Sequence, residues 1–136
     1  MSNFDPAKVS QTAPNREKIY TCGYSSASMQ IMASRTAEVH ASFLLPYLRP
    51  GMRLLDCGCG PGTITVGLAD VVAPGEAVGI DIEPAQLDFA RARAAEKPVT
   101  SVHFEIGDIC DLAFPDGAFD AVFGHTILMQ FQDPTA

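Results

Sequence analysis

The stretch Leu54-Leu55-Asp56-Cys57-Gly58-Cys59-Gly60-Pro61-Gly62-Thr63 decides the fold of this chain. Its first part belongs to a short apolar run over residues 52–57, and its last residue opens a segment, 63–72, in which apolar side chains follow helical spacing. We therefore expect a strand, a glycine loop and a helix in that order. The three alternate glycines let the backbone of the loop pass close to a ligand that any Cβ would displace.

The alternation of strand and helix continues along the chain. Strands are predicted over residues 77–81, 102–106 and 119–124, and Pro84 suits the first turn of a helix after the first of them. Such alternation predicts a parallel sheet with right-handed crossovers and helices on both faces. The expected fold class is therefore α/β, with a Rossmann-like sheet whose ligands bind beyond the carboxyl ends of the strands.

The region before the glycine loop is predicted to have two parts. Residues 1–27 contain two prolines and no sustained period, so they are expected to form an amino-terminal arm, with a partial domain over 28–136. Apolar residues then follow helical spacing over 34–48, which predicts a helix leading into the core.

The composition describes one soluble globular domain. The 136 residues carry nine Lys plus Arg against sixteen Asp plus Glu, a formal net charge of −7, and 47% of them are hydrophobic. Nucleic-acid binding needs clustered Lys and Arg, and the sequence contains no such cluster. No run approaches the roughly 18 apolar residues of a membrane span, and the first residues do not resemble a secretory signal, so a cytoplasmic protein is expected.

Two phosphate-binding motifs are alternative interpretations of the glycine loop. The P-loop pattern needs a lysine, which the loop lacks, and the dinucleotide pattern G-x-G-x-x-G needs glycine where Thr63 stands. Pro61 removes one backbone donor, a loss that a ligand held at a carboxylate and an amine tolerates better than pyrophosphate does. Cys57 and Cys59 do not have Cys-x-x-Cys spacing, so reduced thiols and no metal site are expected.

Three acidic residues follow predicted strands at one edge of the sheet. Asp56 could orient the loop or approach an ammonium group, because an unpaired buried carboxylate is costly. Asp81 lies nineteen positions after the last loop glycine, where one carboxylate can accept from two vicinal ribose hydroxyls; helix capping is the alternative. Asp108 could accept from an exocyclic amine while the backbone of Ile109 pairs with a ring nitrogen, which suits an adenine edge, although Gly-Asp is also an ordinary turn.

Taken in order, these motifs resemble those of class I S-adenosylmethionine-dependent methyltransferases. The resemblance is carried by residues 56–62, Asp81, Asp108 and the stretch Phe119-Asp120-Ala121-Val122, and it extends over about residues 35–134. Within that superfamily the chain is most similar to the branch that includes the ubiquinone and menaquinone biosynthesis methyltransferases. The resemblance implies an enzyme that binds S-adenosylmethionine and transfers its methyl group to a small molecule.

The resemblance also implies roles for single residues. The loop from Gly58 through Cys59 to Gly60 would border the methionine part of the cofactor, Asp81 its ribose hydroxyls and Ile82 one face of its adenine. By the same resemblance, Asp108 and Ile109 would meet the adenine edge.

Weaker assignments fall on either side of this core. Gly124 and His125, after the fourth strand, would approach the methionine amino group or the reacting end. Arg35 would pair with the methionine carboxylate, and Tyr20 or Tyr24 would close over the cofactor. A solvated arginine or a core-packed tyrosine is the alternative.

His125 is also the candidate for a catalytic group, because an imidazole beside the methyl donor could act as a general base toward a hydroxyl or amine. A histidine that only bonds backbone is the alternative, and His40 and His103 are weaker candidates, on a predicted helix surface and in a predicted strand. No catalytic role is assigned as certain, since alignment of an already activated donor can supply most of the rate enhancement.

The chain departs from the resembled family in length. The family sheet has seven strands, with the first between the second and the fourth, whereas four are predicted here; the fourth would be left as an open apolar edge. Either the chain is a fragment or truncated product, or a second copy covers that edge. A non-catalytic cofactor-binding module is therefore the main alternative function, while Thr63 disfavours an NAD-dependent oxidoreductase.

Overall fold

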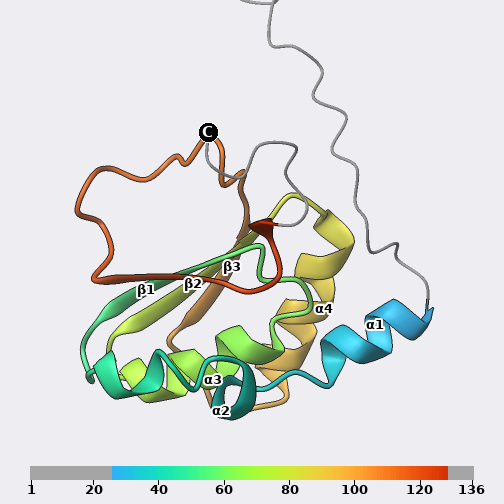
Figure 1. Cartoon of the computed structure of the whole chain (residues 1–136), viewed down its shortest axis with the longest axis horizontal. Coiled ribbons are helices and arrows are strands. Elements are labelled where there is room, and N and C mark those ends of the chain that lie inside the picture. The colour runs from blue at the N-terminus through green and yellow to red at the C-terminus, as the bar shows by residue number, and fades with distance from the viewer. Residues whose placement is uncertain (1–25, 129–136) are drawn as a thin grey trace, which may run out of the picture.

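The computed structural model describes residues 26–128, which form a parallel sheet and its connecting helices (Figure 1). Before the glycine loop come α1 (Ser26–Ala33), α2 (Ala37–His40) and the 3₁₀ turn η2 (Leu45–Tyr47). The sheet and its crossovers consist of β1 (Arg53–Cys57), α3 (Thr63–Val72), β2 (Glu76–Asp81), α4 (Pro84–Ala95), β3 (Val102–Ile106) and β4 (Ala121–Gly124). The predicted fold class, a Rossmann-like α/β sheet, is confirmed.

The strands lie in the order β3-β2-β1-β4, and all neighbours are parallel. The first strand therefore lies between the second and the fourth, as expected, and β4 is an edge strand. Cys57 pairs with Ile80 on one side and with Gly124 on the other. The chain leaves β1 toward β2 but returns from β3 to β4, so the carboxyl ends of β1 and β4 form the switch point where ligands bind in such sheets.

One face of the sheet is covered by the helices. Strand alternation turns Leu54 of β1 and the paired Ala77 of β2 toward this face, where α2 and α3 pack on them. Farther along the same face, Phe104 of β3 packs with Val66 of α3 and Leu87 of α4. The buried apolar residues of α3 recur with a helical period. This period explains why residues 63–72 form a helix as predicted.

The expectation of helices on both faces is wrong for the described residues. The second face carries a cluster of Leu55, Cys57, Val78 and Ile80, and it is covered by the connection from β3 to β4, the orange segment that Figure 1 shows without a helix. The crossovers from β1 to β2 and from β2 to β3 run one way along the sheet, and the connection from β3 to β4 runs back the other way. Because all such crossovers are right-handed, the returning connection lies on the opposite face. Its Phe114-Pro115-Asp116-Gly117 turn interrupts any helical period.

The predicted helix over 34–48 is also broken in the structure. Only α2 and η2 form, because Pro46 has no N–H and cannot continue an α-helix through this region. Thr36 caps α2, and its Oγ1 accepts from the backbone N–H of Val39. Helix α1, which was not predicted, begins at Ser26, close to the expected end of the arm.

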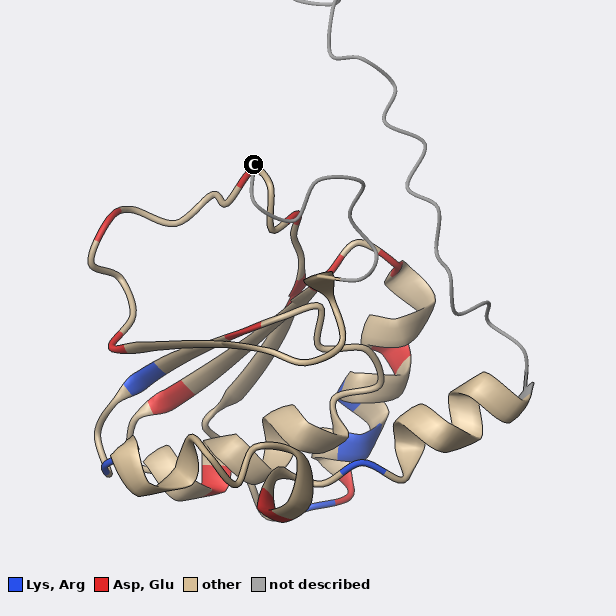
Figure 2. Cartoon of the chain, viewed as in Figure 1, with Lys and Arg blue, Asp and Glu red and all other residues tan. Residues whose placement is uncertain are grey.

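The charged residues of the described part lie on several elements of the fold. Figure 2 shows the Lys and Arg positions of the described part on separate elements, among them β1 and α4. Among residues 26–128, no helix has the length and apolar character needed to cross a membrane.

Candidate functional site

The glycine loop after β1 has a backbone that only glycine adopts readily. Gly58, Gly60 and Gly62 have φ values of 68°, 54° and 77°, all in the left-handed region. A Cβ on Gly62 would lie 2.8 Å from atoms of Ala90 and Phe104, so this glycine also lets α3 approach α4 and β3. Beside Gly60 the nearest atom to an added Cβ is the sulfur of Met32 at 4.0 Å, which leaves open space next to the loop.

The loop is fastened to the end of β2 by two hydrogen bonds. The backbone N–H of Cys59 donates to the carbonyl of Ile80 over 2.9 Å. Asp81 accepts from Gly60 N–H through Oδ2 and from Glu83 N–H through Oδ1, both over 3.0 Å. A carboxylate has about four lone-pair sites, so Asp81 keeps acceptor capacity for a further donor. Asp81 is half-buried at the carboxyl edge, where the sequence predicted it.

Asp56 lies below the loop rather than at its surface. Its side chain is 2% exposed, because the strand alternation turns it toward the helix-covered face. The hydroxyl of Thr65 donates to Asp56 Oδ2 over 2.6 Å. Burial raises the pKa of Asp56 to about 7, the Thr65 bond acts against this rise, and the charge of Asp81 adds to it. The bond to Thr65 ties the end of β1 to the first turn of α3, which follows the glycine loop.

The third acidic residue lies beside Asp81. The backbone N–H of Gly107 donates to the carbonyl of Asp81 over 3.1 Å, which brings the ends of β2 and β3 together. Oδ1 of Asp108 accepts from the N–H of Cys110 over 3.0 Å, the Asx-turn geometry of an ordinary turn. Ile109 packs against the core of the second face.

A small hollow adjoins these residues. It has a volume of about 270 Å³, and its lining includes Ile80, Gly107 and Phe114 together with the carboxylate-bearing Glu105 and Asp111. The hollow thus lies at the ends of β2 and β3, next to the position predicted for the adenine edge.

A second group of predicted residues meets at the end of β4. Arg35 Nη1 donates to Thr126 Oγ1 over 3.1 Å, so the segment between α1 and α2 is tied to the turn after β4. The ring of His125 stacks on Phe123 and meets the ring of His40 edge-on. Burial, Arg35 and His40 all lower the pKa of His125. Arg35 and His125 are therefore close together.

Ile127 belongs to the site but was not predicted. A Cβ on either Gly58 or Gly124 would clash with its side chain, so Ile127 fills the space between the glycine loop and the end of β4. Its apolar character and its place three residues after a predicted strand gave no sign of this contact. Thr65 was also missed, because its bond to Asp56 joins a helix to a strand and leaves no local signal in the sequence.

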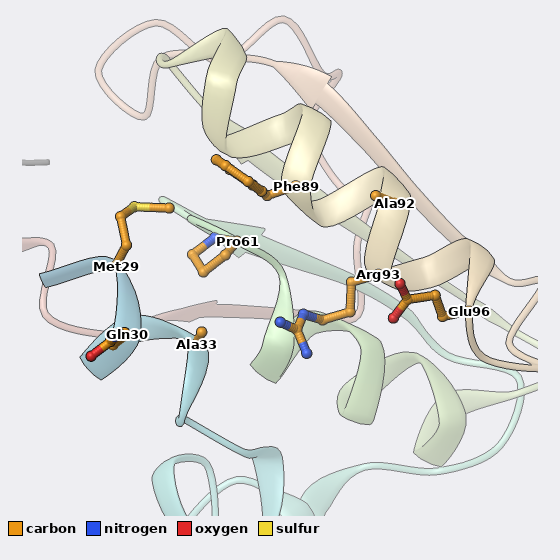
Figure 3. Close-up of a pocket in the computed structure, with 8 residues that line it drawn as sticks. All are labelled: Met29, Gln30, Ala33, Pro61, Phe89, Ala92, Arg93 and Glu96. Carbon is orange, nitrogen blue, oxygen red and sulfur yellow. The ribbon is translucent and has the colours of Figure 1, made fainter. Parts of the chain in front are cut away.

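The larger open groove lies elsewhere. It has a volume of about 370 Å³ and lies between α1 and α4, where Met29, Pro61, Phe89 and Arg93 are among its lining residues (Figure 3). None of the residues that line it was predicted to bind the cofactor.

Some predicted positions are not placed. Tyr20 and Tyr24 lie outside the described residues. Ile82 is half-buried after β2. Within residues 26–128, no three His, Cys, Asp or Glu side chains are grouped so that they could hold a metal ion.

Comparison with known proteins gives one consistent result. Residues 48–136 match the family model described as a methyltransferase domain. The chain is 44% identical over 115 residues to a probable methyltransferase, ltbC, of Aspergillus luteorubrus, covering 79% of this chain and 40% of that protein. It is 34% identical over 102 residues to a demethylmenaquinone methyltransferase of Symbiobacterium thermophilum, covering 73% of this chain and 41% of that protein.

A solved structure agrees with these relatives. Magnesium protoporphyrin IX methyltransferase from Synechocystis, crystallised with bound SAH, matches with a TM-score of 0.53 and 27% identity. The match covers 76% of this chain and 44% of that one. The chain thus spans less than half the length of each of these three proteins.

Proposed function

Because this chain belongs to the family of methyltransferase domains, we propose that it binds S-adenosylmethionine at the carboxyl edge of β1, β2 and β3 and serves methyl transfer to a small molecule. The observation that carries the proposal is the glycine loop, whose left-handed backbone is fastened to Asp81 through Gly60. The SAH bound to the Synechocystis relative supports the identity of the cofactor.

The residues at this edge fit such a cofactor. The space beside Gly60 is open, so the methionine part can lie against bare backbone. Asp81 has lone pairs left for the ribose hydroxyls. The hollow lined by Ile80, Gly107 and Asp111 can take the adenine. Asp56 ties β1 to α3 through Thr65 and is not assigned a ligand contact.

When bound, S-adenosylmethionine supplies a methyl group on a positively charged sulfur, which is already activated for displacement. The protein's contribution is therefore alignment: the loop and Asp81 hold the cofactor in one orientation, and the turn after β4 borders the reacting end. A small-molecule acceptor suits this chain because its relatives include a demethylmenaquinone methyltransferase.

Titration calorimetry with S-adenosylmethionine and S-adenosylhomocysteine tests cofactor binding. We expect saturable one-to-one binding of both, and no heat with NAD. Absence of heat with both adenosyl compounds would overturn the proposal. The NAD-dependent oxidoreductase alternative does not fit the family of this chain.

A radiolabelled methyl assay over phenol, amine and quinol acceptors tests turnover in the same preparation. Label in an acceptor supports transfer by this length of chain. Binding heat without any label transfer would favour the non-catalytic binding module.

The exposed edge of the sheet supports a second proposal, self-association of the chain. Val122 on β4 is 62% exposed, so an apolar strand edge is open to another strand.

The cytoplasmic location expected from the sequence stays a prediction.

A further inference from the structure

The imidazole of His125 is held from two sides at the end of β4. Its ring stacks on Phe123 with a centroid distance of 6.5 Å and an interplanar angle of 15°. The ring of His40, from α2, meets it edge-on at 5.3 Å and 85°. Nδ1 of His125 is buried and has no hydrogen-bond partner among the described residues. Packing therefore fixes the ring plane, while hydrogen bonds within residues 26–128 leave this nitrogen unused.

A strained turn keeps a cation next to this ring. Thr126 has a φ of 56°, which is rare for a β-branched residue and is retained only where the surroundings enforce it. The bond from Arg35 Nη1 to Thr126 Oγ1 supplies such a restraint and places the guanidinium beside the residue that follows His125.

His40 is held in place as well. Its Nδ1 lies 3.1 Å from the backbone nitrogen of Thr36 and 3.2 Å from the carbonyl oxygen of the same residue, so the ring is tied to the residue that caps α2. The titratable and charged groups that act on His125 are thus Arg35, from the segment between α1 and α2, and His40, from α2; no carboxylate of the described residues is among them. Both groups disfavour a positive charge on His125.

His125 follows β4 at the edge of the sheet where the cofactor is proposed to bind. Cys57 pairs with Gly124 across β1 and β4, so the residues that follow them, Gly58 and His125, leave adjacent strand ends at the carboxyl edge of the sheet. Gly58 belongs to the loop proposed to border the methionine part of the cofactor.

We propose that Arg35 and His40 are positioning residues that hold His125 beside the methyl-transfer site, where its imidazole takes the proton of the methyl acceptor. This inference rests on the proposed function. Because Nδ1 is buried, Nε2 is assigned as the nitrogen that receives the proton. The acceptor loses that proton as its oxygen or nitrogen gains the methyl group, and His125 then returns the proton to water, so the residue is restored.

The test is an NMR titration of the histidine Cε1–H signals in the chain without cofactor. The wild type is compared with Arg35→Gln, which removes the charge but keeps an N–H donor for Thr126, and with His40→Phe, which keeps a ring beside His125. Arg49→Gln is the matched control, because the Arg49 guanidinium donates to the nearby carbonyls of Pro46 and Leu48.

We expect the titration midpoint of His125 to lie below that of an ordinary histidine and to rise in Arg35→Gln and in His40→Phe, with no change in Arg49→Gln. A midpoint that stays in place in both variants, while their spectra remain folded, would overturn the inference. The titration needs no cofactor, so its outcome is separate from the calorimetric test of S-adenosylmethionine binding.

In a preparation that turns over an acceptor, the acid limb of kcat/KM should follow the same midpoint and move to higher pH in His40→Phe. A role of His40 in packing alone would lower the rate at every pH and leave the limb in place.

Discussion

The carboxylate of Asp81 accepts a 3.0 Å hydrogen bond from the backbone N–H of Gly60, 21 positions earlier in the chain. This bond joins the end of β2 to the loop after β1. The side chain that is proposed to grip the ribose therefore also sets the shape of the loop that borders the methionine part. One substitution at this position should disturb both contacts.

We expect Asp81→Asn to weaken S-adenosylhomocysteine binding at least about tenfold, because an amide has one acceptor oxygen and cannot accept from Gly60, Glu83 and a ribose together. Tenfold corresponds to about 1.4 kcal/mol, within the usual contribution of hydrogen bonds to a charged group. Calorimetry measures the change. Asp120→Asn is the control: Asp120 also accepts a backbone N–H, from Arg53, but at the opposite edge of the sheet. Equal affinities in both variants would contradict the prediction.

The raised pKa of Asp56 predicts a pH-dependent stability. Its folded value of about 7 lies above the unfolded value of 3.8, so the native state binds this proton more tightly. The contribution of Asp56 is therefore fully present below about pH 4 and is lost as the pH rises through about 7.

In Asp56→Asn this contribution disappears, while an acceptor oxygen for Thr65 remains. We expect the free energy of unfolding of the variant, relative to wild type, to increase by about 2–4 kcal/mol between pH 4.5 and pH 8. Urea titrations at the two pH values measure it. The same difference at both would show that the carboxyl group titrates normally.

Gly62 and Gly117 separate backbone strain from packing. Both have positive φ, 77° and 73°, but a Cβ at Gly62 would lie 2.8 Å from Ala90 and Phe104, whereas nothing lies within 4 Å at Gly117. We expect Gly117→Ala to cost about 1–2 kcal/mol of unfolding free energy, from strain alone. Gly62→Ala should cost about 1–3 kcal/mol more, from overpacking. Urea unfolding measures both losses of unfolding free energy. Equal losses in the two variants would contradict the prediction and would mean that the neighbours of Gly62 move aside.

Thr65→Val tests the bond below the loop. The variant keeps the shape of the side chain but leaves Asp56 without its donor, so we expect a loss of about 1–3 kcal/mol at pH 8. The pKa of Asp56 should rise further, because the Thr65 bond opposes the effect of burial. Thr63→Val, in the same helix, removes a hydroxyl that donates 3.2 Å to the Met32 carbonyl at a partly exposed site, and it should cost less. Thermal unfolding compares the two, and the reverse order would contradict the assignment.

The open edge of β4 predicts how the chain associates. Val122→Lys places a charge on the exposed strand edge and should shift the chain toward monomer in sedimentation velocity. Ile31→Lys is the control, because Ile31 is 61% exposed on α1, away from the sheet. A wild-type chain that is monomeric at high concentration would contradict the proposed self-association.

Local sequence signals predicted the strands and crossover helices closely. The helix over 63–72 and the strand over 102–106 have the predicted bounds, because apolar spacing and flanking glycine or proline define both locally. The helix expected over 34–48 was interrupted because Pro46 cannot donate into it. The expectation of helices on the second face was wrong for a different reason. The way in which the connection from β3 to β4 covers the sheet depends on long-range packing.

The sequence by itself determined the order of the elements, the loop of alternate glycines and the acidic residues that follow the strands, because backbone freedom and apolar periodicity act within a few residues. Only the tertiary structure decided that Asp56 faces Thr65 below the loop while Asp81 holds the loop from its edge. It also decided that Arg35 reaches Thr126, 91 positions away, and so stands beside His125. Such contacts depend on how strands are ordered and which face each side chain takes, and no local pattern in the sequence records them.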